Sequence, residues 1–392
     1  MSIEKKNYKK NHRGHNEGSC YQRKDGKWTG QVQVGFDKNG KRKFITKTAK
    51  TRQEISDWLA ETRNDILKSN FVDVNDITLE QWLWNWMTTY KLKNVSSNTY
   101  SRYLILMNNH IIPNIRGLKL SNVKSMHIQK IYNKLSEEGM SYSSLKHAHS
   151  IFNQALDCAV RENLISKNFA TYTVRKKPRQ ENEVEVFTPD EQQKILDNLE
   201  ITPIGVLIKT AIGTGCRLGE LLGLSWDDID FKNNIINIRN GLHKEKIFSD
   251  DGKKIIGYEL QIGVLKTHTS KRTISIADST ASFLMKYKLR QREFIKSNLY
   301  PNLVFLSEAG TLWDESNARK MYMKFLKQIG VPCRKFHALR HTYATRLLEN
   351  DIHPKVAQEL LGHSTCDITM NVYSHVLPEK KIEAIKKIKD IV

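Results

Sequence analysis

The stretch Lys335-Phe336-His337-Ala338-Leu339-Arg340-His341-Thr342-Tyr343-Ala344-Thr345 organises the last third of this chain. It predicts a loop that runs into a helix. His337 and Arg340 are three residues apart, so a helix places them on one face. Leu339, Tyr343 and Leu347 recur at a spacing of four and predict the side that packs into a core. A basic pair on one helix is more often part of an ordinary surface than of a functional site. Its value as evidence therefore depends on whether other residues of the chain could bind the same phosphate.

A second signal lies upstream, between Ala211 and Glu220, after an apolar helical pattern. Gly213 and Gly215 predict a tight turn, and Arg217 begins the next helix. Glu220 follows three residues later, where its carboxylate can orient the guanidinium of Arg217. From spacing alone, an ordinary helix ion pair is the favoured interpretation.

A tight basic turn is predicted between these two stretches, in the run Lys266-Thr267-His268-Thr269-Ser270-Lys271-Arg272. Strand patterns begin near Glu259 before it and at Thr273 after it. We therefore expect Lys266 at the tip of a β-hairpin, from which its long side chain reaches outward. The alternative, an exposed turn lysine without a function, is the more common case.

The segment after the opening stretch predicts a helix over 356–361 that ends at Gly362, the usual position for a helix-stopping glycine. His363 follows directly. Tyr373 lies on a predicted short helical turn. The tail, residues 378–392, is amphipathic and is expected to pack on this chain or on a neighbouring copy.

The bulk composition indicates a polyanionic partner. The 392 residues predict two or three domains, and 63 Lys+Arg against 42 Asp+Glu leave a net charge of +21. Nucleic acid is the first choice and an anionic membrane surface the lesser alternative. No long apolar run predicts a membrane span and no signal peptide is visible. The five scattered cysteines are typical of reduced thiols in a cytosol. We therefore expect a cytoplasmic protein.

The N-terminal segment concentrates the positive charge. Residues 1–17 predict a flexible lead-in, and residues 18–70 a three-stranded sheet followed by a helix, because Asp-Gly and Asn-Gly separate alternating runs. Residues 1–70 hold 17 Lys+Arg and 8 Asp+Glu, a net of +9. A basic, Gln-rich sheet face can enter a major groove, whereas the alternative is a solvated face. The candidate DNA contacts are Arg23, Lys27, Lys41 and Lys43.

The middle of the chain predicts an all-helical block over 75–174, with Arg102 as a candidate DNA contact. Residues 175–184 form a charged run without an apolar period, which predicts a linker. Thr188-Pro189-Asp190-Glu191 carries the signals of a helix start, so a third domain is expected over 185–392.

The ordered residues of the third domain resemble the tyrosine recombinase (phage integrase) family, and most closely the integrases of conjugative transposons. We call these residues the catalytic set: Arg217, Lys266, His337, Arg340, His363 and Tyr373. The resemblance implies a multidomain chain: a small three-stranded sheet plus helix that binds arm-type DNA, an all-α core-binding domain, and a mixed, mainly-α catalytic domain with a small antiparallel sheet.

The chemistry of the catalytic set fits a phosphodiester. Arg217 and Arg340 can clamp its anionic oxygens and neutralise the charge that grows in the transition state. Tyr373 is the nucleophile, and its phenol, with a pKa of about 10, needs a base or a cationic pocket. The resemblance implies a covalent 3′-phosphotyrosine link that leaves a 5′ hydroxyl.

The resemblance also implies the remaining roles. Lys266 looks like the general acid, His337 like a base that assists Tyr373, and His363 like a phosphate donor, with Glu220 orienting Arg217. No cofactor and no metal are implied. His341 has no place in the set, so we assign it a structural role. The expected partners are double-stranded DNA at core and arm sites, three further copies in a homo-tetramer, an excisionase and a host DNA-bending protein, with no membrane.

Three other functions compete with integration and excision of a mobile element. A type IB topoisomerase shares the phosphotyrosine chemistry but relaxes DNA, and the separate sheet domain and amphipathic tail speak against it. A chromosome-dimer resolvase normally lacks the basic sheet domain. A non-catalytic DNA-binding regulator requires a degenerate catalytic set, whereas this set is complete.

Overall fold

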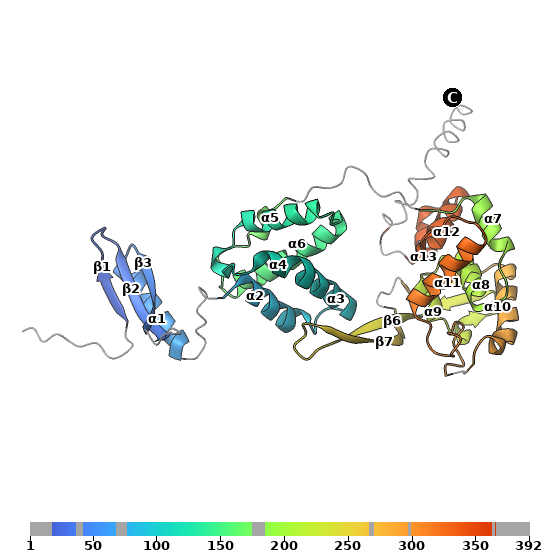
Figure 1. Ribbon diagram of the computed structural model, residues 1–392, viewed down its shortest axis with the longest axis horizontal. Coiled ribbons are helices and arrows are strands. Elements are labelled where there is room, and N and C mark those ends of the chain that lie inside the picture. The colour runs from blue at the N-terminus through green and yellow to red at the C-terminus, as the bar shows by residue number, and fades with distance from the viewer. Residues whose placement is uncertain are drawn as a thin grey trace, which may run out of the picture.

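The computed structural model describes residues 18–36, 42–67, 77–174, 185–265, 270–296, 299–362 and residue 365. Along the chain these residues form an N-terminal body, a middle helical body and a C-terminal body (Figure 1). Each body has its own hydrophobic core. In this part of the chain, no helix is long and apolar enough to cross a membrane.

The N-terminal body is the predicted sheet with one helix on it. Strands β1 (Ser19–Gln22), β2 (Trp28–Phe36) and β3 (Arg42–Ala49) pair antiparallel in the order β1-β2-β3, and α1 (Arg52–Leu67) follows. Val32 is buried between the sheet and the helix residues Ile55 and Leu59. Alternation along β2 therefore sends Gln31 and Gln33 to the opposite, open face.

Two of the four predicted DNA contacts of this body lie at the β1–β2 turn. Arg23 and Lys27 are exposed and close the β1–β2 turn through a backbone hydrogen bond of 2.8 Å from the Arg23 N–H to the Lys27 carbonyl. Lys41 lies outside the described residues, and the side chain of Lys43 is not among those described. Gln31 and Gln33 are half-buried, and DNA binding by this face stays a prediction.

The middle body is all-helical, as predicted. It comprises α2 (Leu79–Trp86), α3 (Ser97–Leu106), α4 (Ile112–Ile115), α5 (Ser125–Glu137) and α6 (Tyr142–Arg161). A π-helical turn extends α2 over Met87–Lys91, and another joins α3 to α4 over Met107–Ile111. Thr78 closes a capping box with Gln81, which accounts for the helix start at Leu79.

In the C-terminal body, helices pack around small β-sheets. The helices are α7 (Pro189–Asp197), α8 (Pro203–Thr214), α9 (Leu218–Leu222), α10 (Asp278–Arg290), α11 (Glu315–Gln328), α12 (His337–Glu349) and α13 (Pro354–Leu361). The predicted capping box of Thr188 and Glu191 starts α7. Phe187 is fully buried in this core, and its backbone N–H donates to Thr342 Oγ1 at 2.9 Å. The boundary of the third domain near Glu185 stays a prediction.

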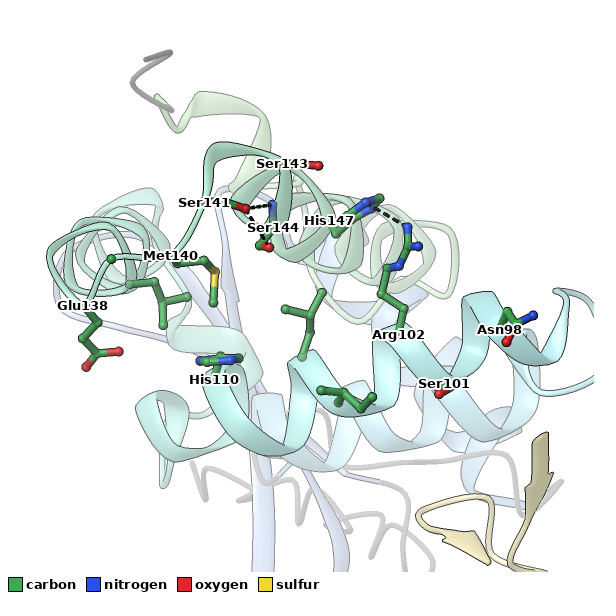
Figure 2. A pocket seen from close by; sticks show the side chains of 14 residues that line it. Asn98, Ser101, Arg102, His110, Glu138, Met140, Ser141, Ser143, Ser144 and His147 are labelled. Atoms are coloured by element: carbon green, nitrogen blue, oxygen red, sulfur yellow. Dashed lines mark hydrogen bonds between the residues drawn. The ribbon is translucent and has the colours of Figure 1, made fainter. Parts of the chain in front are cut away.

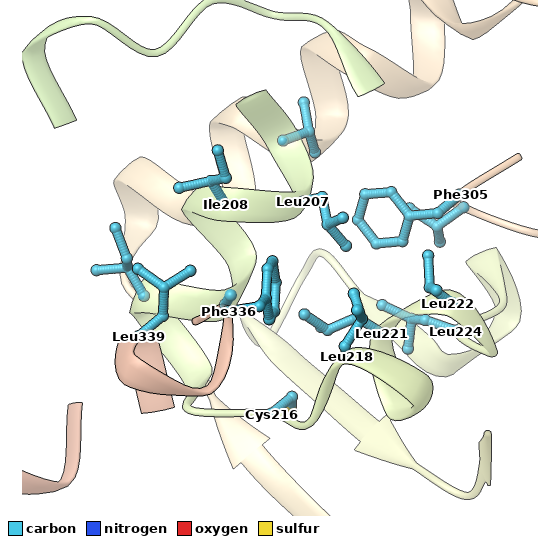
Figure 3. Close-up of a cluster of buried hydrophobic side chains, with 14 of the residues drawn as sticks. Leu207, Ile208, Cys216, Leu218, Leu221, Leu222, Leu224, Phe305, Phe336 and Leu339 are labelled. Carbon is cyan, nitrogen blue, oxygen red and sulfur yellow. The ribbon is translucent and has the colours of Figure 1, made fainter. Parts of the chain in front are cut away.

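The apolar core of the C-terminal body lies directly beneath the candidate site. Leu218 and Leu221 of α9 pack with Phe336 and Leu339 of the stretch 335–345 (Figure 3). Cys216 lies at the edge of the same cluster, next to Arg217 in the chain. Because these side chains are buried, core packing fixes the backbone on which Arg217 and Arg340 lie.

Strand pairing contradicts the predicted hairpin around Lys266. The strands β4 (Ile229–Asp230), β5 (Ile235–Ile238) and β8 (Arg272–Ser275) form one sheet, whereas β6 (Asn240–Phe248) pairs with β7 (Ile255–Val264). Val264 of β7 lies opposite Asn240 of β6, and Arg272 of β8 lies opposite Ile238 of β5. Strands β5 and β6 are separated only by Arg239, so β7 and β8 pair with neighbouring parts of the chain. Among the described residues, β7 therefore pairs with β6 and β8 with β5, and β7 and β8 do not pair with each other. Lys266 itself lies outside the described residues.

A smaller correction concerns the two glycines after the apolar helix. Gly213 belongs to α8 and does not form a turn with Gly215. Gly215 alone ends the helix, in the left-handed conformation with φ of +63°.

The β6–β7 hairpin links the C-terminal body to the middle body (Figure 1). The buried Tyr100 of α3 donates a hydrogen bond of 2.9 Å from its hydroxyl to the carbonyl of Gly252 at the hairpin turn. Phe248 packs edge-on against Tyr100, with ring centroids 4.8 Å apart. A Cβ on Gly252 would lie 2.8 Å from the Tyr100 hydroxyl, and its φ is +66°. The turn therefore requires glycine for both conformation and space.

We predict that Tyr100→Phe loosens the hairpin. The change removes the hydroxyl donor from the Gly252 carbonyl, at a cost of about 0.5–1.5 kcal/mol. Hydrogen exchange of the turn amides, residues 249–254, should become faster. Tyr258→Phe, at a tyrosine of β7 that is 57% exposed, is the matched control and should leave exchange unchanged. Equal exchange in both variants would show that this hydrogen bond does not hold the turn.

Candidate active site

Arg340 lies at the centre of the site, on α12, with 2% of its surface exposed. Its Nη1 donates to the carbonyl of Gly215 at 2.8 Å, and its Nη2 to the carbonyl of Leu361 at 2.7 Å. Both carbonyls lie at helix C-terminal ends, which carry unpaired acceptors and partial negative charge. The guanidinium is thus bound where α8 and α13 both end.

The neighbours of Gly215 show how closely the helices meet at this point. A Cβ on Gly215 would lie 2.4 Å from Tyr343 Cδ1 and 3.0 Å from Leu361 Cδ2. Leu339 is fully buried as predicted, while Tyr343 and Leu347 are half-buried. The buried face of α12 therefore differs slightly from the predicted face of Leu339, Tyr343 and Leu347, because Arg340 is also buried.

Arg217 stands at the start of α9 and is bound to Glu220 twice. Its Nη1 donates to Glu220 Oε1 at 2.7 Å and its backbone N–H to Oε2 at 2.9 Å. Its Nη2 reaches the carbonyl of Gly362 at 3.3 Å. The predicted orienting role of Glu220 is consistent with this geometry, since the carboxylate fixes one edge of the guanidinium.

The carboxylate of Glu220 is charged although it is buried. Burial by itself raises the pKa of Glu220, but the hydrogen bond and charge of Arg272, and then those of Arg217, lower this pKa below its ordinary value. Arg272 Nη2 donates to Glu220 Oε2 at 2.9 Å, and 6% of the Arg272 side chain is exposed. The carboxylate of Glu220 therefore pairs with Arg272 as well as with Arg217, and is more than one partner of an ordinary helix ion pair.

His337 is in its neutral form at physiological pH. Its pKa is lowered to about 4, by burial first and then by His341, Arg340 and Arg217. The ring of His341 lies edge-on to it, with centroids 4.6 Å apart and planes at 89°. A neutral imidazole can accept a proton, which suits the base predicted at this position. His341, to which we assigned a structural role, supports the ring of His337.

A cavity of about 780 Å³ opens beside these residues and is lined in part by Arg217, Glu220 and His337. Ser270 also lines it, so the chain returns to the cavity rim directly after the segment that carries Lys266. Lys266, His363 and Tyr373 lie outside the described residues, and their roles stay predictions.

The described side chains around Glu220 carry excess positive charge. Arg217 and Arg272 both pair with its carboxylate, and the charge of Arg340 acts beside them, whereas Glu315 on the cavity lining is paired with Arg319. Burial, followed by the charges of Arg217 and Arg272, lowers the pKa of Arg340 to about 9, so it is still a cation at neutral pH. A bound anion relieves this repulsion, and an anion whose charge grows during reaction relieves it further.

A second hollow lies on the middle body and includes the predicted DNA contact Arg102. It measures about 700 Å³ and is lined by α3 and the start of α6 (Figure 2). Arg102 Nη1 lies 3.0 Å from His147 Nε2, and Ser141, Ser143 and Ser144 line the same hollow. Guanidinium and hydroxyl groups are typical contacts to a DNA backbone. DNA binding by Arg102 remains a prediction.

Arg272 is the residue of the site to which we assigned no role from the sequence. The only signal for it was its place at the end of the basic turn, directly before a strand. Three of its four hydrogen bonds go to residues 52, 56 and 88 positions away in the chain. No local spacing reports contacts of that range.

Comparison with known proteins supports the resemblance to the tyrosine recombinase (phage integrase) family. Residues 185–380 match the phage integrase family, and residues 78–136 match the N-terminal SAM-like domain of phage integrases. A "Tyrosine recombinase XerC-like" protein of Caldanaerobacter subterraneus subsp. tengcongensis is 35% identical over 375 residues, which cover 92% of this chain and 95% of that protein.

Solved structures show the same fold. The Tn1549 transposon integrase in complex with transposon right end DNA superposes with a TM-score of 0.66, at 23% identity, over 79% of this chain and 99% of that one. A lambda integrase tetramer bound to a Holliday junction has a TM-score of 0.55, at 21% identity, over 92% of this chain and 96% of that one.

The fold, the arginine-lined cavity and these matches define an enzyme of the site-specific DNA recombinase class. The chain belongs to the phage integrase family of tyrosine recombinases. The predicted resemblance to integrases of conjugative transposons is confirmed, as is the predicted fold class.

We predict that the imidazole of His337 titrates near pH 4 in the DNA-free protein. The unfolded chain takes up this proton at about pH 6.5, so stability should fall as pH drops from about 6.5 towards 4. Arg217→Met should move the midpoint upward, because it removes one of the charges that lower it. Histidine ring NMR measures both midpoints. A midpoint at the ordinary value in the unmodified protein would contradict the assignment of a neutral base.

Proposed function

We propose that this recombinase cuts and rejoins DNA through a covalent bond between Tyr373 and a 3′ phosphate, and so integrates and excises a mobile element. The observation that supports the proposal is the placement of Arg217 and Arg340. Their guanidiniums bind the neighbouring carbonyls of Gly362 and Leu361, directly before His363. The end of α13 therefore lies beside both phosphate-binding candidates.

In the proposed cleavage step, the phenolic oxygen of Tyr373 forms a bond to the scissile phosphorus while the bond to the 5′ oxygen breaks. The phenolic proton passes to the neutral His337, and Lys266 gives a proton to the leaving 5′ oxygen. Arg217 and Arg340 bind the nonbridging oxygens, with Glu220 orienting Arg217 and His363 as a further donor. Attack by a 5′ hydroxyl of a second DNA reverses the step and completes strand exchange.

The three bodies suggest a division of DNA contacts. We assign arm-type sites to residues 18–70, with Arg23, Lys27, Lys41 and Lys43 at the DNA. Core sites fall to residues 75–174, including Arg102, and to the catalytic domain, 185–392, with 175–184 as linker. The tetrameric lambda integrase on a Holliday junction supports a homo-tetramer as the working unit. An excisionase and a host DNA-bending protein complete the proposed assembly at the bacterial nucleoid.

We predict that Tyr373→Phe binds DNA normally but forms no covalent adduct, because it lacks the nucleophilic oxygen. A nicked suicide duplex carrying the end sequences of the mobile element traps the adduct of the unmodified protein, which denaturing electrophoresis detects. Tyr300→Phe, at a tyrosine that is 41% exposed, is the control and should form the adduct. An adduct with Tyr373→Phe would refute the proposal. Two-site recombination, as opposed to relaxation alone, separates it from a topoisomerase.

We predict that Lys266→Ala slows cleavage by about a hundredfold or more, within the range for a lost general acid. A substrate with a 5′-bridging sulfur has a leaving group that needs no proton, so it should restore most of the rate. Lys271→Ala, at an exposed lysine of the same segment, is the control and should cleave both substrates normally. Absence of rescue in Lys266→Ala would remove Lys266 from the role of acid.

A further inference from the structure

Arg272 makes four hydrogen bonds inside the protein, in three directions. Its Nε donates to the carbonyl of Leu360 at 2.7 Å and its Nη1 to the carbonyl of Ser270 at 3.0 Å. Its Nη2 donates to Glu220 Oε2 at 2.9 Å and to Cys216 Sγ at 3.3 Å. With 6% of its side chain exposed, this arginine is engaged by protein groups and is not presented to solvent.

The partner groups of Arg272 are also the partners of the phosphate-binding candidates. The other oxygen of Glu220 binds Arg217 Nη1 at 2.7 Å. At the end of α13, Leu360, Leu361 and Gly362 offer their carbonyls to Arg272, Arg340 and Arg217 respectively. Consecutive carbonyls at one helix end are thus bound by different arginines, so displacement of Arg272 disturbs both supports of Arg217.

Arg346 shows that such bonding need not concern the site. It lies on the same helix as Arg340, donates to the carbonyl of Phe187 at 2.8 Å and to Gln192 Oε1 at 3.0 Å, and pairs with Glu349. Its partners anchor the start of the domain and none of them binds Arg217 or Arg340 in the described structure. Arg346 is therefore a matched arginine whose role is structural.

We propose that Arg272 is a positioning residue for DNA cleavage: it holds Arg217 in the orientation that binds the scissile phosphate, through the shared carboxylate of Glu220 and the last turn of α13. The inference rests on the proposed function. A guanidinium is required because its planar fork reaches a carboxylate and two backbone carbonyls at once, whereas a lysine ammonium concentrates its donors at one point.

The test compares cleavage of two nicked suicide duplexes that carry the end sequences of the element, one with a scissile phosphate and one with a methylphosphonate. The methylphosphonate lacks one anionic oxygen and so depends less on arginine charge. We expect Arg272→Met and Arg272→Lys to slow cleavage of the phosphate about tenfold to a hundredfold, less than loss of a direct donor. As with Arg217→Met, the loss should shrink on the methylphosphonate.

The control Arg346→Met should lose the same factor on both duplexes, because any effect arises from stability. Arg272→Lys keeps the charge and serves if Arg272→Met does not fold, as judged by thermal melting. Equal losses on both duplexes for the Arg272 variants, or wild-type rates, would overturn the inference. Rescue by a 5′-bridging sulfur would also overturn it, because Arg272 would then act on the proton donor. If the wild-type protein forms no adduct, the proposed function itself fails.

Discussion

The binding of arginine side chains to the C-terminal carbonyls of α13 is the interaction on which the site depends. A helix ends with carbonyls that lack partners within the helix, and here guanidiniums supply them. Because Arg217, Arg272 and Arg340 come from α9, β8 and α12, one helix end joins three separate elements. Gly215 adds the end of α8 to the same junction.

Burying arginines has an electrostatic cost, and that cost has a functional meaning. Desolvation and mutual repulsion lower the pKa of Arg340, and one carboxylate does not balance the cluster. A cavity beside uncompensated, fixed cations is arranged in advance for an anion, so little reorganisation is needed when charge develops on a phosphate. Burial, followed by the charges of His341, Arg340 and Arg217, lowers the pKa of His337, so its ring is unprotonated at neutral pH.

The contact between the β6–β7 hairpin and α3 gives the middle and C-terminal bodies a second connection besides the chain itself. Tyr100, Phe248 and Gly252 form it through a buried hydroxyl, an edge-on ring contact and a glycine without room for a side chain. The contact therefore joins the two bodies through side chains and a turn that lie far apart in the sequence.

The order of the bodies, the helix starts at Thr188 and Arg217 and the stop at Gly362 were predictable from sequence, because caps and helical periods are local signals. Motif order also predicted that Arg217, Glu220 and His337 lie together, and these three line one cavity, with Arg340 close enough for its pKa to be affected by Arg217 and Glu220. The hydrogen bonds of Arg272 to Glu220 and Leu360 and the hairpin contact to Tyr100 were not. Each joins residues that lie at least 52 positions apart in the chain, and up to 152 positions for Tyr100 and Gly252. Only the packed structure decides such contacts, since hydrogen bonds to a buried guanidinium are set by which helix ends and strand edges meet around it, not by the residues beside it in the sequence.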